Sequence, residues 1–175
     1  MSLVQIYAPA PRAADDTAAG VTYDGSSLRG ATVAVINNGW GSIAELTTFL
    51  EQQLRDHYGV SEVHFFKNPD KGHPAPESFI AEVSEAATVA ITGLGRCGAC
   101  TGWTCDTSVR LAKAGVKAGI VITKPFERLA HYCVGSAGAP GHPVVVLPVD
   151  FEYSDTDHLR RAAQQTVTEL FGQQA

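Results

Sequence analysis

The sequence lacks several features that define large classes of proteins. No uninterrupted apolar run in its 175 residues approaches the ~18 residues of a membrane span. The N-terminus has neither the basic start nor the apolar core of a signal peptide. The 13 Lys and Arg residues are scattered and the net charge is −5, which argues against nucleic acid or anionic membrane as a partner. We therefore expect a cytoplasmic protein with no nucleic-acid partner and no membrane partner.

Common catalytic and nucleotide-binding motifs are also absent. The sequence has no P-loop, no dinucleotide-binding fingerprint and no nucleophile-elbow serine. It contains no internal repeat. With 45% hydrophobic and 18% charged residues, the chain is expected to be globular, and its length fits one domain. Its function must therefore be inferred from other residues.

Five apolar segments alternate with amphipathic segments after an N-terminal arm. The arm, residues 1–30, is rich in proline, small residues and acids, and we expect it to be irregular. The apolar segments predict strands at 31–36, 60–67, 88–92, 118–123 and 143–149. The patterns between and after them predict helices at 42–58, 77–85, 107–115, around 126–133 and at 156–171. Ser42 is the predicted N-cap of the first helix, with Glu45 at the spacing of a capping box.

This alternation is typical of parallel strands that are covered on both faces and joined by right-handed crossovers. We therefore predict an α/β fold in a single domain over residues 31–175. The expected architecture is a three-layer sandwich with a parallel five-stranded sheet in the flavodoxin-like order 2-1-3-4-5. Ligands in such sheets bind at the carboxyl ends of the strands, where the strand order reverses. Two glycine-rich turns, 37–42 and 93–100, are expected to meet there.

Three of the four cysteines fall between the third predicted strand and the helix that follows: Cys97, Cys100 and Cys105. Cys97 and Cys100 have the spacing of a dithiol, and Cys100 lies where a helix should begin. A helix N-terminus and the neighbouring Arg96 would both favour a thiolate. Three interpretations stay open: a reactive thiol with a resolving partner, a zinc or soft-metal site, and small residues packed at a tight turn. A zinc site would need ligands from elsewhere, such as Cys133 or a histidine.

The segment from Cys97 to Trp103 resembles the UGSC family of proteins and selenoproteins. The resemblance continues through Asp106, Leu-Ala-Lys-Ala-Gly-Val at 111–116 and Ile-Val-Ile-Thr at 120–123, and spans about residues 30–172. The family motif is selenocysteine-Gly-Ser-Cys after a strand, and its first position, which alternates between selenocysteine and cysteine, falls on Cys97. This implies a nucleophile or redox centre at that position. The chain departs from the family pattern at Ala99, Gly102 and Cys105, and at Lys124-Pro125, which stands where an acidic pair is common before Phe126.

The segment is also distantly similar to the selenocysteine region of the substrate-handling component of glycine, sarcosine and betaine reductases. That similarity implies attack by the first chalcogen on a carbon or heteroatom of the substrate, with release of a leaving group. We therefore predict a cysteine-dependent enzyme, a thiol-dependent reductase or lyase that cleaves a carbon–heteroatom bond of a small electrophilic substrate. Two alternatives remain: a protein that binds zinc or a soft metal through the cysteines, and a non-catalytic thiol redox sensor.

Cys97 is the predicted nucleophile, and Cys100 is the predicted stabilising or resolving thiol. The expected catalytic residues are Cys97, Cys100, Cys105 and Asp106. The expected substrate-binding residues are Asn37, Asn38, Trp40, Gly98, Thr101, Trp103 and Lys124. Many of these residues also have a purely structural alternative, in a turn, a helix end or the core. We expect a homodimer, a low-molecular-weight thiol or a reductase as electron donor, no cofactor and no metal.

Overall fold

The computed structural model describes residues 23–70, 73–149 and 155–173. Its strands are β1 (Thr32–Asn37), β2 (Glu62–Lys67), β3 (Val89–Gly95), β4 (Lys117–Thr123) and β5 (Val144–Leu147). Its α-helices are α1 (Gly41–Tyr58), α2 (Glu77–Ala86), α3 (Gly98–Lys113), α4 (Glu127–Ser136) and α5 (Thr156–Phe171). Two short 3-10 helices, η1 (Gly25–Leu28) and η2 (Lys124–Phe126), precede β1 and α4.

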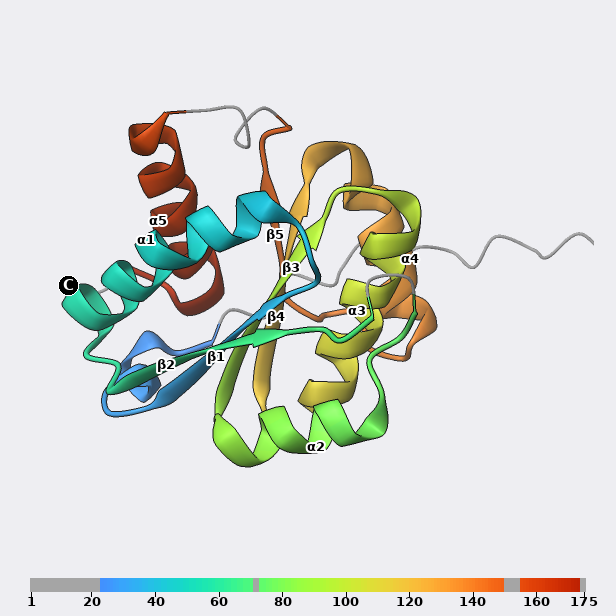
Figure 1. The fold of residues 1–175 in the computed structure, drawn as a ribbon, viewed down its shortest axis with the longest axis horizontal. Helices are drawn as coiled ribbons and strands as arrows, with labels where there is room; N and C mark the ends of the chain where they lie inside the picture. Colours follow the sequence, from blue (N-terminus) through green and yellow to red (C-terminus); the bar gives the residue numbers. More distant parts are fainter. Residues whose placement is uncertain (1–22, 71–72, 150–154, 174–175) are drawn as a thin grey trace, which may run out of the picture.

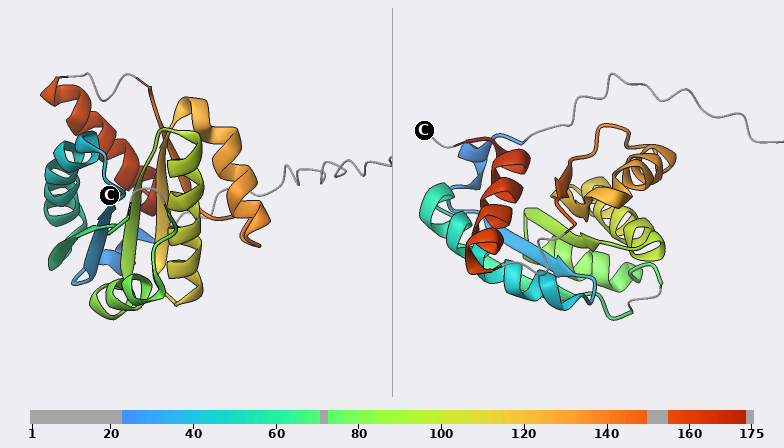
Figure 2. Two further views of the ribbon diagram at one scale, coloured as in Figure 1. Left: turned by 45° about the vertical axis from the view of Figure 1, so that its right-hand side comes forward. Right: turned by 90° about the horizontal axis from the view of Figure 1, so that it is seen from above.

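The five strands form one parallel sheet in the order β2-β1-β3-β4-β5. Helices α1 and α5 pack together on one face, while α2, α3 and α4 cover the other (Figures 1 and 2). The predicted three-layer sandwich and its strand order are therefore confirmed. The order reverses between β1 and β3, so the loops after these two strands meet at one end of the sheet.

Alternation along β1 explains why the sheet carries helices on both faces. Val33 and Val35 pack into the core beneath α1 and α5, whereas Ala34 and Ile36 pack into the core beneath α2 and α3. All seven residues of the central strand β3 are buried. A strand buried on both faces is typical of a parallel sheet with helices on each side.

Strand β3 continues past its predicted end, through Gly93 to Gly95. The prediction that a glycine-rich turn begins at residue 93 is wrong, because these two glycines allow close packing within the sheet layers. A Cβ on Gly93 would lie 2.9 Å from Cδ1 of Ile43 on α1, and one on Gly95 would lie 2.6 Å from Cγ2 of Ile122 on β4. The turn is therefore reduced to the two residues between Gly95 and α3.

The helices that follow β1 and β3 both begin earlier than the sequence predicts. Trp40, and not Ser42, is the N-cap of α1. The turn between β1 and α1 is shorter than predicted, and Asn37 Oδ1 stabilises it by accepting a hydrogen bond from the Gly39 N–H at 2.6 Å. The helix predicted at 107–115 begins at Gly98, because the Cys97 sulfur caps its first turn. The cysteine motif is thus part of a helix.

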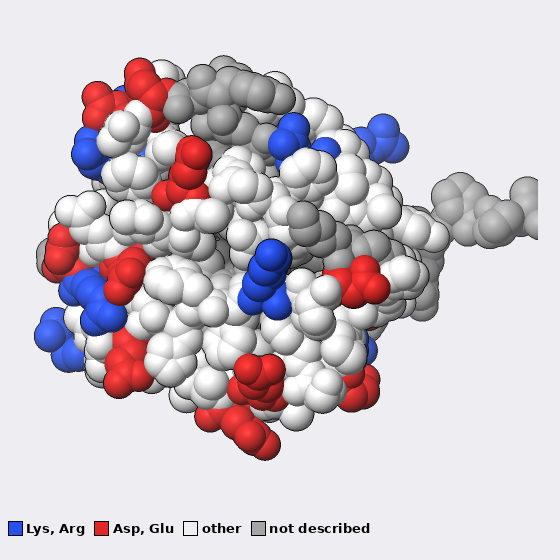
Figure 3. Space-filling view, in the orientation of Figure 1, with Lys and Arg blue, Asp and Glu red and all other residues white. Residues whose placement is uncertain are grey.

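The segment before β1 contributes to the core. Leu28 in η1 is completely buried, and the Tyr23 hydroxyl donates a hydrogen bond to the carbonyl oxygen of Ala118 at 3.0 Å. These residues belong to the predicted arm, whose first 22 residues lie outside the described part of the chain. On the face shown in Figure 3, Lys and Arg side chains are dispersed and do not form one broad basic patch.

Candidate functional site

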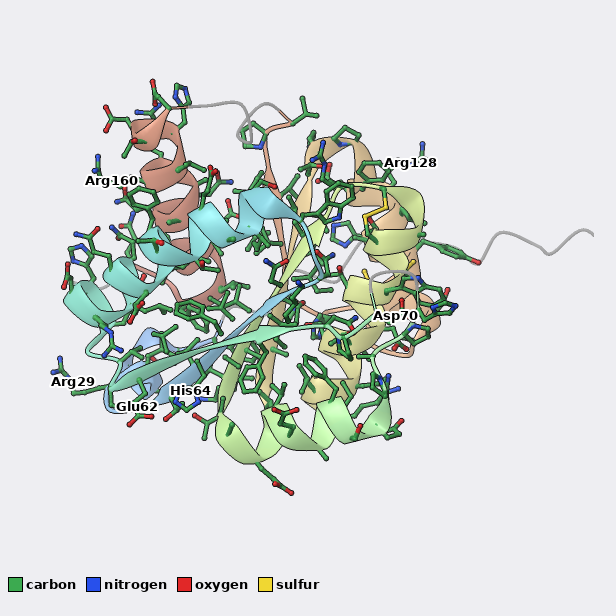
Figure 4. All side chains as sticks on the ribbon, in the orientation of Figure 1. Arg29, Glu62, His64, Asp70, Arg128 and Arg160 are labelled. Carbon is green, nitrogen blue, oxygen red and sulfur yellow. A yellow bond between two sulfur atoms is a disulfide. The ribbon has the colours of Figure 1, made fainter. Side chains whose placement is uncertain are left out.

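Cys97 and Cys100 lie at the start of α3, at the carboxyl end of β3. Cys97 is the N-cap residue, and its sulfur accepts a hydrogen bond from the backbone N–H of Cys100 at 3.0 Å. The two sulfurs are joined in a disulfide, with the Cα atoms 5.3 Å apart. Figure 4 shows this bond at the same end of the molecule as Arg128 of α4. The pair can therefore interconvert between a dithiol and a disulfide without a large backbone movement.

The two sulfurs differ in their access to solvent. Cys97 is half-buried and is followed by the exposed residues Gly98 and Ala99, whereas Cys100 is only 6% exposed. A reagent from solution would therefore meet Cys97 first. Cys100 lies behind it, within bonding distance of its sulfur. The attacking role of Cys97 and the resolving role of Cys100 stay predictions.

A cation stacked on an aromatic ring lies beside the pair. The guanidinium carbon of Arg96 is 4.5 Å from the centre of the Trp40 ring. Arg96 directly precedes Cys97, and Trp40 is the N-cap of α1, so the contact joins the two loops that meet where the strand order reverses. Such contacts contribute about 0.5–1 kcal/mol at exposed sites. The stack thus holds the side chain of the residue that directly precedes Cys97 against the loop after β1.

Asn37 and Asn38, both predicted to bind substrate, have structural contacts in this structure. Asn38 is buried, and its amide holds Leu94 from both sides: Nδ2 donates to the Leu94 carbonyl oxygen at 2.7 Å, and Oδ1 accepts from the Leu94 N–H at 2.8 Å. Nδ2 also lies 2.7 Å from the Thr104 hydroxyl oxygen. Asn38 thereby joins β1 to the end of β3 and to α3. Asn37 shapes the turn before α1 through Gly39.

Three buried side-chain polar atoms lack a hydrogen-bond partner among the described residues: Ser42 Oγ, Thr101 Oγ1 and Trp103 Nε1. All three lie in the first two turns of α1 or α3, the helices that begin at the reversal of strand order. Buried polar groups almost always have a partner, which can be a protein atom, a water molecule or a ligand. The three atoms thus lie together at the end of the sheet where the strand order reverses.

A small cavity of about 10 Å³ lies beneath Trp103, between α3 and the ends of β1 to β3. This volume corresponds to about one water molecule. Its polar lining consists of Asn38, Asn68, Thr92, Trp103, Thr104 and Thr107. A single water bound there would give Trp103 Nε1 a partner. The cavity is too small to hold a substrate.

The remaining predicted site residues lie apart from the dithiol or are paired locally. Asp106 forms an ion pair with Arg110 at 3.1 Å, one turn further along α3. Lys124 Nζ forms an ion pair with Glu127 at 2.6 Å. Cys105 is 1% exposed and faces α4, and burial raises the pKa of its thiol to about 12. Their catalytic and binding roles stay predictions.

Sequence reasoning missed several residues that shape this region. Arg96 was recognised only as a neighbour of Cys97, since its stacking partner Trp40 comes from a different loop. Asn68 directly follows β2, just as Asn38 directly follows β1. The recurrence of an asparagine after each of these strands is the sequence signal that could have identified Asn68. No such signal identifies Thr104.

The described residues were also considered for metal binding and for membrane-spanning helices. No group of three or more His, Cys, Asp or Glu residues is arranged to hold a metal ion in the ranges 23–70, 73–149 and 155–173. Within the same ranges, none of the helices combines the length and the apolar character needed to cross a membrane.

Comparison with known proteins identifies the family. The chain is similar to the receiver domain of the histidine kinase CKI1 from Arabidopsis thaliana in a crystal structure complexed with Mg2+, with a TM-score of 0.43 and 16% sequence identity. The match covers 73% of this chain and 90% of that chain. No curated protein matches this sequence. The model of the UGSC family matches residues 5–173, and the chain therefore belongs to the UGSC family.

Proposed function

We propose that this protein is a thiol-dependent enzyme in which Cys97 attacks a small electrophilic substrate and Cys100 resolves the intermediate. The reaction is the reductive cleavage of a carbon–heteroatom bond. The observation that carries the proposal is the position of Cys97 as the N-cap of α3, with Cys100 directly behind it. Membership of the UGSC family supports the choice of Cys97 as the reactive centre.

The surroundings of Cys97 favour its thiolate form. Its sulfur accepts the Cys100 N–H at the start of a 16-residue helix, where the first N–H groups have no partner within the helix. The positive end of the helix dipole lies at the same place, and the adjoining residue, Arg96, carries a guanidinium group. The same N–H groups, those of Gly98 and Ala99 included, would also stabilise negative charge that develops on a bound substrate.

The chemistry has two steps, which balance in atoms and electrons. In the first, the Cys97 thiolate attacks the substrate carbon, the carbon–heteroatom bond breaks, and the heteroatom leaves with the electron pair and takes up a proton. In the second, the Cys100 thiolate attacks the Cys97 sulfur, and the carbon leaves with its electron pair and is protonated. The substrate is reduced by two electrons, and the dithiol becomes the disulfide. A low-molecular-weight thiol or a reductase returns the protein to the dithiol.

Alkylation of the fully reduced protein tests the identity of the nucleophile. We expect iodoacetamide at neutral pH to modify Cys97 before Cys100, Cys105 and Cys133, as followed by peptide mass spectrometry over time. Cys97→Ser removes the fast phase, and far-UV circular dichroism checks that this variant folds. Equal rates at all four cysteines, or a fast phase that survives in Cys97→Ser, would contradict the proposal.

A second variant tests the resolving role of Cys100. When Cys100→Ser is incubated with candidate electrophiles, we expect an adduct to accumulate on Cys97, because the thiol that would release it is gone. The wild-type protein should release reduced product and accumulate one disulfide per turnover until a thiol is added. Turnover with no disulfide would favour a lyase. A disulfide that forms under oxidants alone, with no substrate consumed, would favour the redox sensor.

A further inference from the structure

The other two cysteines form a second thiol pair, between α3 and α4. Cys105 on α3 is 1% exposed, and Cys133 on α4 is half-buried. They pack in the apolar core between these helices and β4, which also contains Val109, Ile120, Ile122, Ala130 and Val134. Both are free thiols in a structure whose other pair is oxidised.

The two side chains pack in the same core cluster, where α3 faces α4. A hydrogen bond between the two side chains acts to raise the pKa of Cys105 and to lower that of Cys133. The Ala130 carbonyl oxygen, one turn before Cys133 on α4, lies 3.8 Å from the Cys105 sulfur. The Cys105 sulfur therefore faces α4, and Cys133 is the one cysteine in that helix.

We propose that Cys105 and Cys133 are a second redox site, at which a peroxide oxidises Cys133 and Cys105 then closes a disulfide between α3 and α4. Cys133 is half-buried, so a small oxidant can reach it, whereas Cys105 is buried and inaccessible to solvent. The site is separate from the proposed catalytic pair, because it involves neither Cys97 nor Cys100.

The chemistry needs one molecule of peroxide for each disulfide. The Cys133 thiolate attacks a peroxide oxygen, the oxygen–oxygen bond breaks, and the sulfur becomes a sulfenic acid as one water or alcohol is released after protonation. The Cys105 sulfur then attacks the Cys133 sulfur, the sulfur–oxygen bond breaks, and water leaves. The two thiols lose two electrons in total, and the peroxide gains them.

Electrostatics assigns the first step to Cys133. Burial raises the pKa of both thiols, and for Cys133 the hydrogen bond with Cys105 partly opposes this rise. For Cys105, burial is reinforced by the neighbouring Cys133 and by the negative charge of Asp106, which together raise its pKa to about 12. Cys133 therefore loses its proton at a lower pH than Cys105, and oxidation should become faster as the pH rises.

The test uses the full chain with Cys97→Ser and Cys100→Ser, so that only the second pair remains. After hydrogen peroxide treatment, denaturation and iodoacetamide, we expect the intact mass to show the loss of two hydrogens and no alkylation. Peptide mapping should then show residue 105 linked to residue 133. Two fully alkylated thiols, or disulfides only between chains, would overturn the proposal.

Two further variants, in the same background, separate the roles of the thiols. With Cys105→Ala, the sulfenic acid on Cys133 should accumulate and be trapped by dimedone. With Cys133→Ala, Cys105 should stay a free thiol. Dimedone labelling of Cys105 instead would overturn the order of the steps. Mapping the 105–133 linkage in the peroxide-treated wild-type protein gives the same answer if a variant does not fold. None of these outcomes depends on whether Cys97 is a catalytic nucleophile.

Discussion

The hydroxyl oxygen of Ser108 lies 2.7 Å from Nε2 of His142, and both side chains are buried between α3 and the segment before β5. Ser108 is completely buried, so no substrate can reach it, and we assign the pair a structural role. Burial lowers the pKa of His142 from 6.5 to about 4. Between about pH 4 and 6.5, the folded protein thus holds a neutral imidazole where the unfolded chain would carry a positive charge.

The first prediction is a loss of stability in mild acid. From pH 6.5 down to about 4, the unfolded chain takes up a proton on His142 that the folded protein excludes, so the free energy of unfolding falls as the pH falls. The contribution of this one group is on the order of 3 kcal/mol at most. Urea unfolding across this window measures it. The free energy of unfolding should change less with pH in His142→Gln than in the wild-type protein. His131→Gln, at an exposed position, is the control and should behave like the wild type. The same pH dependence in all three proteins would contradict the prediction.

A second prediction concerns the glycine at the end of β3. A Cβ at Gly95 would lie 2.6 Å from Ile122 Cγ2 and 3.0 Å from Thr101 Oγ1, so Gly95→Ala should lower the free energy of unfolding by about 1–3 kcal/mol. Gly102→Ala is the matched control, because nothing lies within 4 Å of its Cβ position inside α3. It should raise stability by about 0.5–1 kcal/mol, as alanine favours a helix interior. Similar stability of the two variants would show that the close approach at Gly95 is unimportant.

The neighbouring asparagines provide a third prediction. Asn38→Ala should lower the free energy of unfolding by about 2–3 kcal/mol, because it leaves the N–H and C=O of Leu94 buried without partners. Asn37→Ala removes a single hydrogen bond to Gly39 and should lower it by about 1 kcal/mol. Chemical denaturation of both variants gives the comparison, and the reverse order of effects would refute the role assigned to Asn38.

Arg96 should accelerate the reaction of Cys97 with anions. In the reduced protein, the rate of alkylation by the negatively charged iodoacetate, relative to neutral iodoacetamide, reports the local charge. Arg96→Met preserves an apolar contact with Trp40 and removes the charge, so the ratio should fall by about three- to fivefold. Lys124→Met should change it less, since Lys124 follows β4 in another loop and forms an ion pair with Glu127. An unchanged ratio in Arg96→Met would show that the stacked guanidinium does not act on Cys97.

The sequence was informative wherever local pattern determines structure. The alternation of apolar and amphipathic segments predicted the sheet order, and α5 spans the predicted residues 156–171. The family motif directed attention to Cys97 and Cys100, which the structure places together at a helix start. These features follow from periodicity and from a compact motif, both of which are local in the chain.

Features that depend on distant parts of the chain could not be predicted in this way. Gly93 and Gly95 looked like turn residues, since their neighbours Ile43 and Ile122 come from other elements. Asn37 and Asn38 are adjacent and identical, yet one shapes a turn and the other holds Leu94, 56 residues away. The contact between Cys105 and Cys133 likewise joins two helices that are separate in sequence.

The glycines around the dithiol divide its surroundings into a rigid side and an adaptable side. On β3, Gly93 and Gly95 leave no room for any side chain, whereas at Gly41, Gly98 and Gly102 nothing lies within 4 Å of a Cβ position. A mutagenesis library intended to change which electrophiles are accepted should therefore leave the strand intact and vary these three helix positions. Graded increases in side-chain size there would measure how large a reactant the thiols can admit.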